Sequence, residues 1–167
     1  MDGYSRKILS WGLNQSMEGL WAEIAVTQAK EQYPHAKPRI ISYNGSQFIS
    51  KDFRELTSLL EIEHTLTSPA HPQSNGKLER FHKTFKSEHV RTSAYFGYDD
   101  AKERMGRWIT YYNEQRLHGA LCYLPPEDVF GGLKEKRLAE RRENLDTAYI
   151  KRRKFWQSLA ATSDTTL

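Results

Sequence analysis

Glu79 and two lysines that follow it are the residues in this sequence whose type and spacing are best suited to chemistry. Glu79 is the one carboxylate within residues 68–80, and Lys83 and Lys86 stand four and seven positions after it. Those offsets return to the same face of a helix, where a lysine ammonium is a point charge that suits a phosphate group. The alternative is a solvated helix face, in which the lysines pair with Glu79 and Glu88 and the carboxylate is favourable near a helix N-terminus.

A strand, a helix and a second strand are predicted upstream of this glutamate. Residues 39–42 are a short apolar strand, and the Asn-Gly pair 44–45 turns it. Ser50 begins a helix, and residues 62–67 alternate as a strand does. Short links between these elements predict a parallel crossover.

Further elements surround this unit. Residues 7–13 predict a short strand, and helices are predicted over residues 16–32, 75–91 and 99–116. Ser16 and Asn75 are suitable N-caps for two of them. The aromatic side chains expected in the core are Trp21, Trp108, Tyr111 and Tyr112.

Four segments resemble the catalytic core of bacterial insertion-sequence transposases and retroviral integrases. They are the turn with Ser5 and Arg6, the strand and turn over residues 40–48, the loop and helix start over residues 68–80, and the Tyr-Tyr-Asn run at 111–113. The last two favour insertion-sequence transposases. The resemblance extends from Asp2 to Phe130 and implies DNA integration, transposition and nucleic-acid binding.

The resemblance implies an α/β fold: a ribonuclease H-like mixed sheet with flanking helices, missing its first strands. We expect an N-terminally truncated integrase core over residues 1–130 and a basic helical tail over residues 131–167. Residues 133–154 contain nine Lys or Arg and four Asp or Glu, so this stretch alone has a surplus of five positive charges in a chain of net charge +4. The basic run 151–154 contacts DNA or forms a solvated face.

The family signature is Asp, then Asp, then thirty-five residues, then Glu, and the resemblance makes Glu79 its catalytic and metal-binding glutamate. Thirty-five residues separate Tyr43 from Glu79, so Tyr43 occupies the position of the second Asp. The first Asp belongs to a strand before Asp2. The family cofactor is Mg²⁺ or Mn²⁺, which needs carboxylate oxygens, whereas a phenol of pKa about 10 is neutral at pH 7. We therefore expect no productive metal binding and no strand transfer.

The resemblance also assigns DNA contacts. It makes Lys83 and Lys86 phosphate contacts, and it places Gln47 and Asn75 beside the active site, with turn geometry as the alternative role of these two. The segment 68–76 resembles the flexible active-site loop of the family.

Composition limits the location and partners of the protein. No apolar run is long enough to cross a membrane, and the six histidines are not expected to form a metal site. Cys122 is the single cysteine, which excludes an intramolecular disulfide and fits a reducing cytosol; we expect its side chain to be buried. A cytoplasmic, nucleoid-associated protein that binds DNA follows, with a second copy or a full-length transposase as a further partner.

Three functions remain open at this point. The chain is an inactive transposase core that retains affinity for DNA, a regulatory module that pairs with an intact transposase, or an enzyme that recruits a substitute carboxylate. An open sheet edge, which invites pairing with another chain, favours the second.

Overall fold

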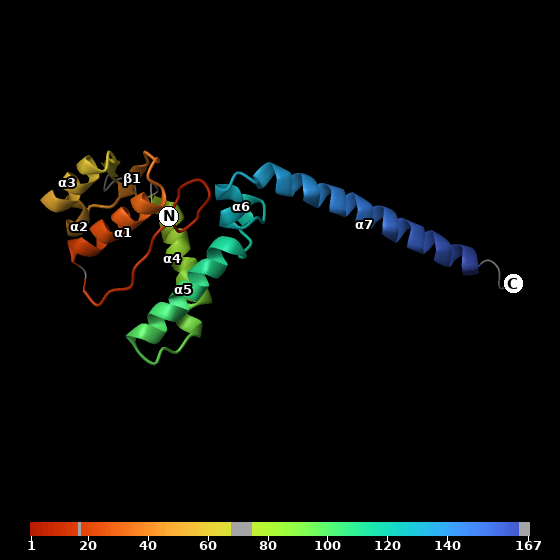
Figure 1. Ribbon diagram of the computed structural model, residues 1–167. Helices are drawn as coiled ribbons and strands as arrows, with labels where there is room; N and C mark the ends of the chain where they lie inside the picture. The colour runs from red at the N-terminus through yellow and green to blue at the C-terminus, as the bar shows by residue number, and fades with distance from the viewer. Residues whose placement is uncertain (17, 68–74, 164–167) are drawn as a thin grey trace.

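The computed structural model describes residues 1–16, 18–67 and 75–163. Two short strands and the helices around them form a body from which one long helix projects (Figure 1). The elements are α1 (Gly19–Gln32), β1 (Arg39–Ser42), α2 (Ser46–Ile49), α3 (Lys51–Leu59), β2 (Glu63–Leu66), α4 (Gly76–Glu88), α5 (Tyr98–Glu114), α6 (Pro126–Phe130) and α7 (Lys134–Ser163), with short 3-10 turns at Val90–Thr92 (η2) and Gly119–Leu121 (η3).

The parallel crossover is confirmed. β1 and β2 pair in parallel, with Arg39 opposite Glu63, and α2 and α3 connect them. Ser50 is the N-cap of α3, and its hydroxyl accepts the Phe53 N–H at 3.2 Å. Phe53 is fully buried between this helix and the strands. Within the described residues the sheet consists of this pair, so the expected mixed sheet is represented only by its parallel strands.

Residues 7–13 do not form the predicted strand. Asn113 of α5 takes the place of a neighbouring strand: its Oδ1 accepts the Ile8 N–H at 2.9 Å and its Nδ2 donates to the Ile8 carbonyl at 3.0 Å. A side chain therefore satisfies the backbone groups that a strand would have paired. The sequence did not indicate this side-chain partner.

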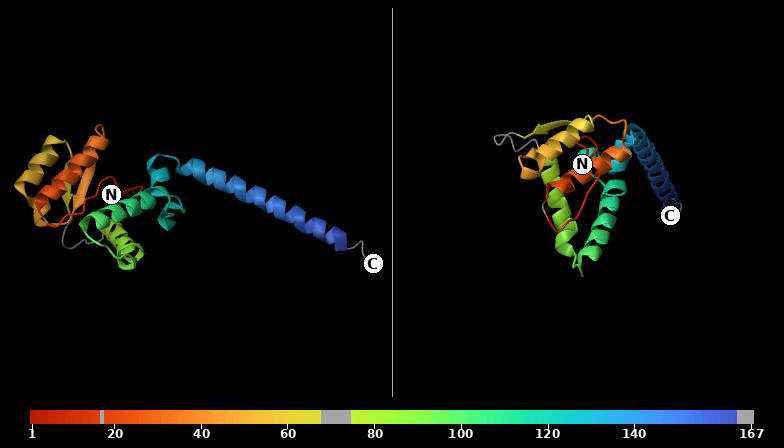
Figure 2. Two further views of the ribbon diagram at one scale, coloured as in Figure 1. Left: turned by 60° about the horizontal axis from the view of Figure 1, so that its bottom comes forward. Right: turned by 60° about the vertical axis from the view of Figure 1, so that its left-hand side comes forward.

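The main core lies between α4 and α5, which approach each other toward the turn that connects them (Figure 2). Phe81 of α4 contacts Tyr112 with ring centroids 5.1 Å apart, and Phe85 contacts Trp108 at 5.0 Å. Ile8 of the N-terminal segment covers the same cluster. Aromatic pairs in such edge-to-face or tilted arrangements add to the free energy gained from their burial.

Several expectations about single residues are wrong. Trp21 and Tyr111 are exposed, because each lies on the outer side of its helix, whereas Trp108 and Tyr112 are buried as expected. Cys122 is also exposed, since it follows η3 in a left-handed turn with φ 57°. Helix α1 begins at Gly19 because the Ser16 hydroxyl accepts the indole N–H of Trp21 at 2.9 Å instead of capping the helix.

Helix α7 is attached to the body only near its start. Arg137 forms an ion pair with Asp128 at 3.0 Å, and Leu138 packs on a small cluster that includes Leu121 and Val129. Arg141 donates to the Cys122 carbonyl at 2.6 Å, and beyond this contact the helix extends away from the body (Figure 1). None of the helices in the described part of the chain has the length and apolar composition needed to cross a bilayer.

Candidate active site and nucleic-acid interface

Tyr43 lies immediately after β1, half exposed to solvent. Its ring packs edge-on against Phe48 with centroids 5.4 Å apart, and its hydroxyl accepts a hydrogen bond from Gln47 Nε2 at 2.9 Å. Gly45 makes this arrangement possible, because a Cβ there would lie 2.7 Å from Gln47 Oε1 and 2.8 Å from the Tyr43 ring. The Tyr43 side chain is thus held by residues of the turn that follows it.

The ends of the two strands are joined beside Tyr43. Asn44 Nδ2 donates to the Thr67 carbonyl at 3.3 Å, and the Thr67 N–H donates to the Ser42 carbonyl at 2.7 Å. The Ser42 hydroxyl lies 2.8 Å from His64 Nε2. Burial lowers the pKa of His64, and the nearby Arg54 charge lowers it further. This strand end is therefore held by neutral hydrogen bonds, with no carboxylate taking part.

Glu79 lies in the first turn of α4 and is exposed. Lys83 and Lys86 are exposed on the same helix, and none of the three forms an ion pair with another described residue. Glu88 pairs instead with Arg116 at 2.6 Å, and this hydrogen bond holds the pKa of Glu88 below its usual range. The alternative of lysines neutralised by Glu79 and Glu88 is therefore wrong in both of its pairs.

Asn75 occupies the N-cap position of α4, but its side chain does not cap the helix. It therefore begins the helix of Glu79 without the hydrogen bond expected of a good cap. Gln47 has a defined role in the turn, since it holds the Tyr43 hydroxyl. The expected active-site loop falls mostly on residues 68–74, which lie outside the described residues.

Carboxylates do not gather at these positions. Within residues 1–16, 18–67 and 75–163, no three His, Cys, Asp or Glu side chains are grouped so that they could hold a metal ion. No hydrogen bond, ion pair or ring contact joins Tyr43 to Glu79, both of which are described. A site for paired divalent ions generally uses several hard oxygen ligands, of which Glu79 is a carboxylate and Tyr43 is not.

Of two positioning residues, the role of Asn113 was not identified from the sequence, whereas Asp2 lies in the turn that the sequence indicated. Asn113, whose side chain binds both backbone groups of Ile8, stood out only as part of the Tyr-Tyr-Asn run. Asp2 holds the N-terminal turn: its Oδ2 accepts the backbone N–H and the hydroxyl of Ser5, each at 2.6 Å. Burial of Asp2 would raise its pKa, but the hydrogen bonds from Ser5 outweigh that effect and lower it. The Asp-x-x-Ser spacing, which suits a turn closed by the aspartate, was the available signal.

Comparison with known proteins identifies the family. Two descriptions of the integrase core domain match the chain, one over residues 1–72 and the other over residues 60–126. The transposase for insertion sequence element IS904 of Lactococcus lactis is 29% identical over 77% of this chain, which spans only 51% of that transposase. An uncharacterized protein of insertion element IS136 of Agrobacterium fabrum is 32% identical over 75% of this chain and 68% of its own length.

The fold agrees with this relationship. The crystal structure of the catalytic core domain of BIV integrase superposes with a TM-score of 0.59 at 18% identity, covering 80% of this chain and 84% of that domain. The expected ribonuclease H-like α/β fold is thereby confirmed. Integrase core domains generally depend on divalent metal ions. From the matched segments, the relatives and the fold together, the chain belongs to the integrase core domain family of transposases and integrases.

Proposed function

We propose that this chain is a DNA-binding transposase core that does not catalyse strand transfer by itself. The observation that carries the proposal is Tyr43. Its phenol lies at the end of the strand, where the family signature has a carboxylate. Its hydroxyl is hydrogen-bonded to Gln47 rather than free to bind a metal ion. Glu79, the remaining residue of that signature, has no carboxylate partner in the described residues.

The DNA-binding part of the proposal rests on the exposed face of α4. Lys83 and Lys86 carry positive charges that no described residue neutralises, seven or fewer positions from Glu79. Cations on such a face bind phosphates without reading sequence, so the binding is sensitive to salt. Gln47 and Asn75 contribute polar contacts at the edge of this surface.

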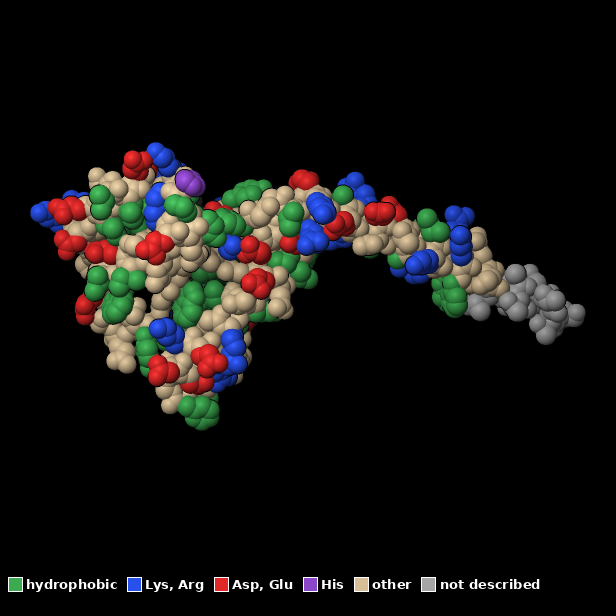
Figure 3. Space-filling view, in the orientation of Figure 1, with side chains coloured by type: hydrophobic (Ala, Val, Ile, Leu, Met, Phe, Trp, Pro, Cys, Tyr) green, Lys and Arg blue, Asp and Glu red, His purple; other side chains and the backbone are tan. Residues whose placement is uncertain are grey.

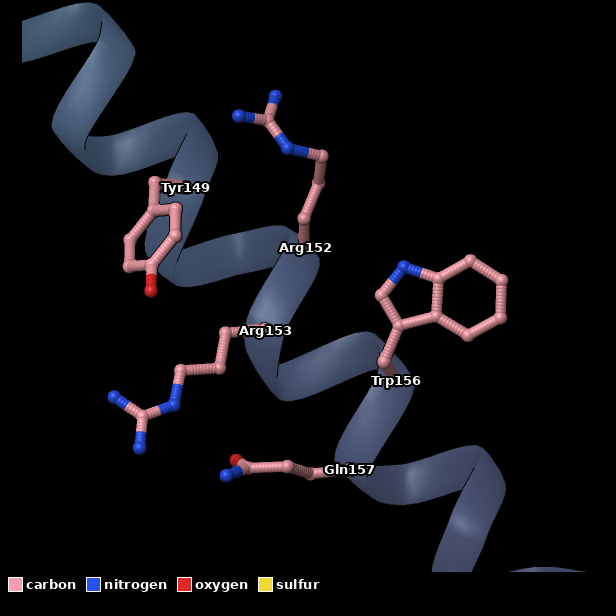
Figure 4. Close-up of a pocket in the computed structure, with 5 residues that line it drawn as sticks. All are labelled: Tyr149, Arg152, Arg153, Trp156 and Gln157. Carbon is pink, nitrogen blue, oxygen red and sulfur yellow. The ribbon is translucent and has the colours of Figure 1, made fainter.

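The projecting helix supplies a second basic surface. We propose that the catalytic-core fold ends near Phe130 and that residues 131–167 form a basic helical tail. Figure 3 shows acidic and basic side chains mixed along the near part of α7 and basic ones further out. In Figure 4, Tyr149, Arg153 and Gln157 project from one side of the helix and Arg152 and Trp156 from another. Guanidinium groups and aromatic rings so interleaved suit a nucleic-acid strand.

Two assays on the full chain test this function. With supercoiled plasmid and Mg²⁺ or Mn²⁺, we expect no nicking beyond that of Glu79→Gln, because the metals lack ligands. In binding to duplex DNA, Lys83→Gln/Lys86→Gln should reduce the slope of log affinity against log salt by about 2, one unit for each phosphate that is no longer neutralised. The control is Lys51→Gln/Lys102→Gln, which removes two exposed lysines elsewhere. Nicking that Glu79→Gln abolishes would refute the inactivity, and equal slopes in all proteins would refute the interface.

A regulatory partner of an intact transposase is the second candidate. The strand pair carries apolar side chains that remain exposed, including Ile41 and Leu66. Burying such residues against another chain is favourable, and a short two-stranded sheet gains stability by pairing. Such a protein would act on nucleoid DNA as a homo-oligomer or together with a full-length transposase. Co-purification with the complete transposase of a related element, abolished by Ile41→Lys, would support this role.

A further inference from the structure

A second, separate group of cations lines a cavity on another side of α4. The cavity has a volume of about 550 Å³ and lies between α4, the end of α5 and the N-terminal turn. Its charged and polar lining residues are Arg6, Lys77, Arg80, Thr84, Tyr112, Arg116 and His118, and we call this cavity the basic pocket. Helical spacing places its residues 77, 80, 81 and 84 on a different side of α4 from Glu79, Lys83 and Lys86.

Positive charge in the basic pocket is only partly neutralised. None of its lining residues is an Asp or Glu. Glu88, at the far end of α4, pairs with Arg116 through two hydrogen bonds of 2.8 and 2.6 Å. Lys77 donates to the Gly3 carbonyl at 2.8 Å, which leaves its charge uncompensated. Arg6 and Arg80 have no ion pair with any described residue. Three of the four cations therefore face the cavity without a counter-ion in the described part of the chain.

The local structure fixes the backbone of Arg6 and the side chain of Arg116. The Arg6 N–H donates to the Asp2 carbonyl at 3.0 Å, which closes a tight turn and places Arg6 at φ 67°. This left-handed conformation is uncommon for a residue with a side chain, and such strain concentrates at functional sites. Arg116 is held by Glu88, with its guanidinium carbon 5.9 Å from the centre of the Tyr112 ring.

Two titratable groups in the basic pocket, His118 and Tyr112, have pKa values that the neighbouring charges shift. His118 Nε2 lies 3.0 Å from the Tyr112 hydroxyl. Burial lowers the pKa of His118, the charges of Arg116 and Arg6 lower it further, and Glu88 opposes them. Burial also raises the pKa of Tyr112 to about 12, against the effect of the same arginines. Both groups are thus uncharged near pH 7 and offer hydrogen bonds rather than competing charge.

We infer that the basic pocket binds a phosphate group. Guanidinium forks from separate elements match the several acceptor oxygens of a phosphate, and the charge of the anion supplies the missing counter-ion. The phosphate belongs either to a DNA backbone or to a free phosphate compound. If the phosphate belongs to DNA, the inference rests on the function proposed above. The pocket then gives the core a second contact with DNA, on a side of α4 away from Glu79. Binding of free phosphate does not depend on that function.

The first experiment titrates the full chain with inorganic phosphate and follows the His118 ring signals by NMR. A bound anion favours the imidazolium, so the pKa of His118 should rise, and its signals should shift at millimolar phosphate. Arg6→Gln/Arg80→Gln should weaken this response at least about tenfold, because two charge-assisted hydrogen bonds to the anion can no longer form. These arginines form no ion pair with another residue that the structure describes, and circular dichroism checks that the variant stays folded. Arg91→Gln/Arg107→Gln, which removes two exposed arginines outside the cavity, should respond as the original protein does.

The second experiment separates the two sources of phosphate. If the pocket holds a DNA phosphate, Arg6→Gln/Arg80→Gln reduces the salt slope of duplex binding by about 2, whereas Arg91→Gln/Arg107→Gln does not. An unchanged slope together with an abolished phosphate response assigns the pocket to free phosphate compounds. If phosphate leaves the His118 signals unmoved, or moves them equally in both double variants, the inference is wrong. DNA binding that fails while the phosphate response persists counts against the proposed function alone.

Discussion

The helix pair α4 and α5 and the strand pair β1 and β2 differ sharply in how well they are packed. The helix pair is built on Trp108 and Tyr112, which Phe81 and Phe85 cover. Around the strands only a few side chains are buried, Phe53 foremost, and no residue of α1 is fully buried. Leu59 of α3 is 80% exposed.

The tightly packed part of the molecule is therefore the helix pair, where we expect substitutions to cost the most stability. Aromatic side chains form the core of this pair, and α4 carries the proposed DNA contacts Lys83 and Lys86. Tyr43, a bulky ring, follows the first strand at the position that we propose corresponds to the second Asp of the family signature. A weakly packed region accommodates such a change with little rearrangement, whereas the aromatic cluster would not.

Tyr112→Ala should have the largest effect, because this ring is 1% exposed and contacts Phe81 and Trp108. We expect a loss of about 4 kcal/mol in the free energy of unfolding. The neighbouring Tyr111→Ala is the control, since its exposed ring should cost about 0.5 kcal/mol. Urea titration followed by circular dichroism measures the free energy of unfolding of both variants. Similar losses would contradict the burial of Tyr112 and the exposure of Tyr111.

Phe53→Ala should cost less, about 3 kcal/mol, because the partly exposed surroundings of this ring can relax into the cavity. Its neighbours Phe48 and His64 lie 5.4 and 5.1 Å from it between centroids. Amide hydrogen exchange should show the loss of protection in β1 and β2 and not in α5. Equal loss of protection in α5 would mean that the two regions unfold as one unit.

Asn113→Ala tests the link between the N-terminal segment and α5. Removing the amide leaves both backbone groups of Ile8 without their partner, and we expect a loss of about 2 kcal/mol. Asn44→Ala, which breaks one exposed hydrogen bond of 3.3 Å in the strand region, should cost much less. If denaturant titration gave comparable losses in the free energy of unfolding for both variants, Asn113 would not be replacing the hydrogen bonds of a neighbouring strand.

Acid should destabilise the protein before its carboxylates titrate. Burial lowers the pKa of His64, His82, His89 and His118 below the ordinary value of 6.5. The unfolded chain therefore binds more protons than the folded one as the pH falls below about 6.5, so the free energy of unfolding decreases there. Denaturant titrations between pH 7.5 and about pH 5 should show this decrease, and stability that rises on acidification would contradict the burial of these rings.

Tyr43→Asp should have the smallest effect on stability, less than about 1 kcal/mol, because the ring is half exposed. It should not restore Mg²⁺-dependent strand transfer, since no group of three carboxylate, His or Cys side chains suited to a metal ion is present among the described residues. Strand transfer by this single variant, measured with a labelled DNA end, would show that a further carboxylate completes the site.

The sequence predicted the local features of this molecule better than the distant ones. Ser50 begins α3 as predicted, and the parallel strands agree with the crossover that the short links between these elements favoured. The role of Asn113 could not be predicted, because its partner Ile8 lies 105 residues away. The basic pocket was missed for the same reason, since its cations come from three separate parts of the chain and share no spacing.

The sequence identified candidate residues of the site but not the contacts that those residues make. The family pattern pointed to Glu79 and Tyr43, but the hydrogen bond from Gln47 depends on the turn that Gly45 permits. The expected pairing of the lysines with Glu88 does not form, because Arg116, from the segment that follows α5, binds Glu88 instead. Fork-like pairing of a guanidinium with a carboxylate is stronger than the point-charge contact of a lysine.

The most direct measurement is a titration of the full chain with Mn²⁺, followed by calorimetry and by paramagnetic broadening of the amide signals of Tyr43 and Glu79. One acidic side chain cannot retain two hard cations, so the expected result is weak, non-saturating heat that is identical in Glu79→Gln. Stoichiometric uptake of two ions, with broadening at both residues that Glu79→Gln abolishes, would contradict the account.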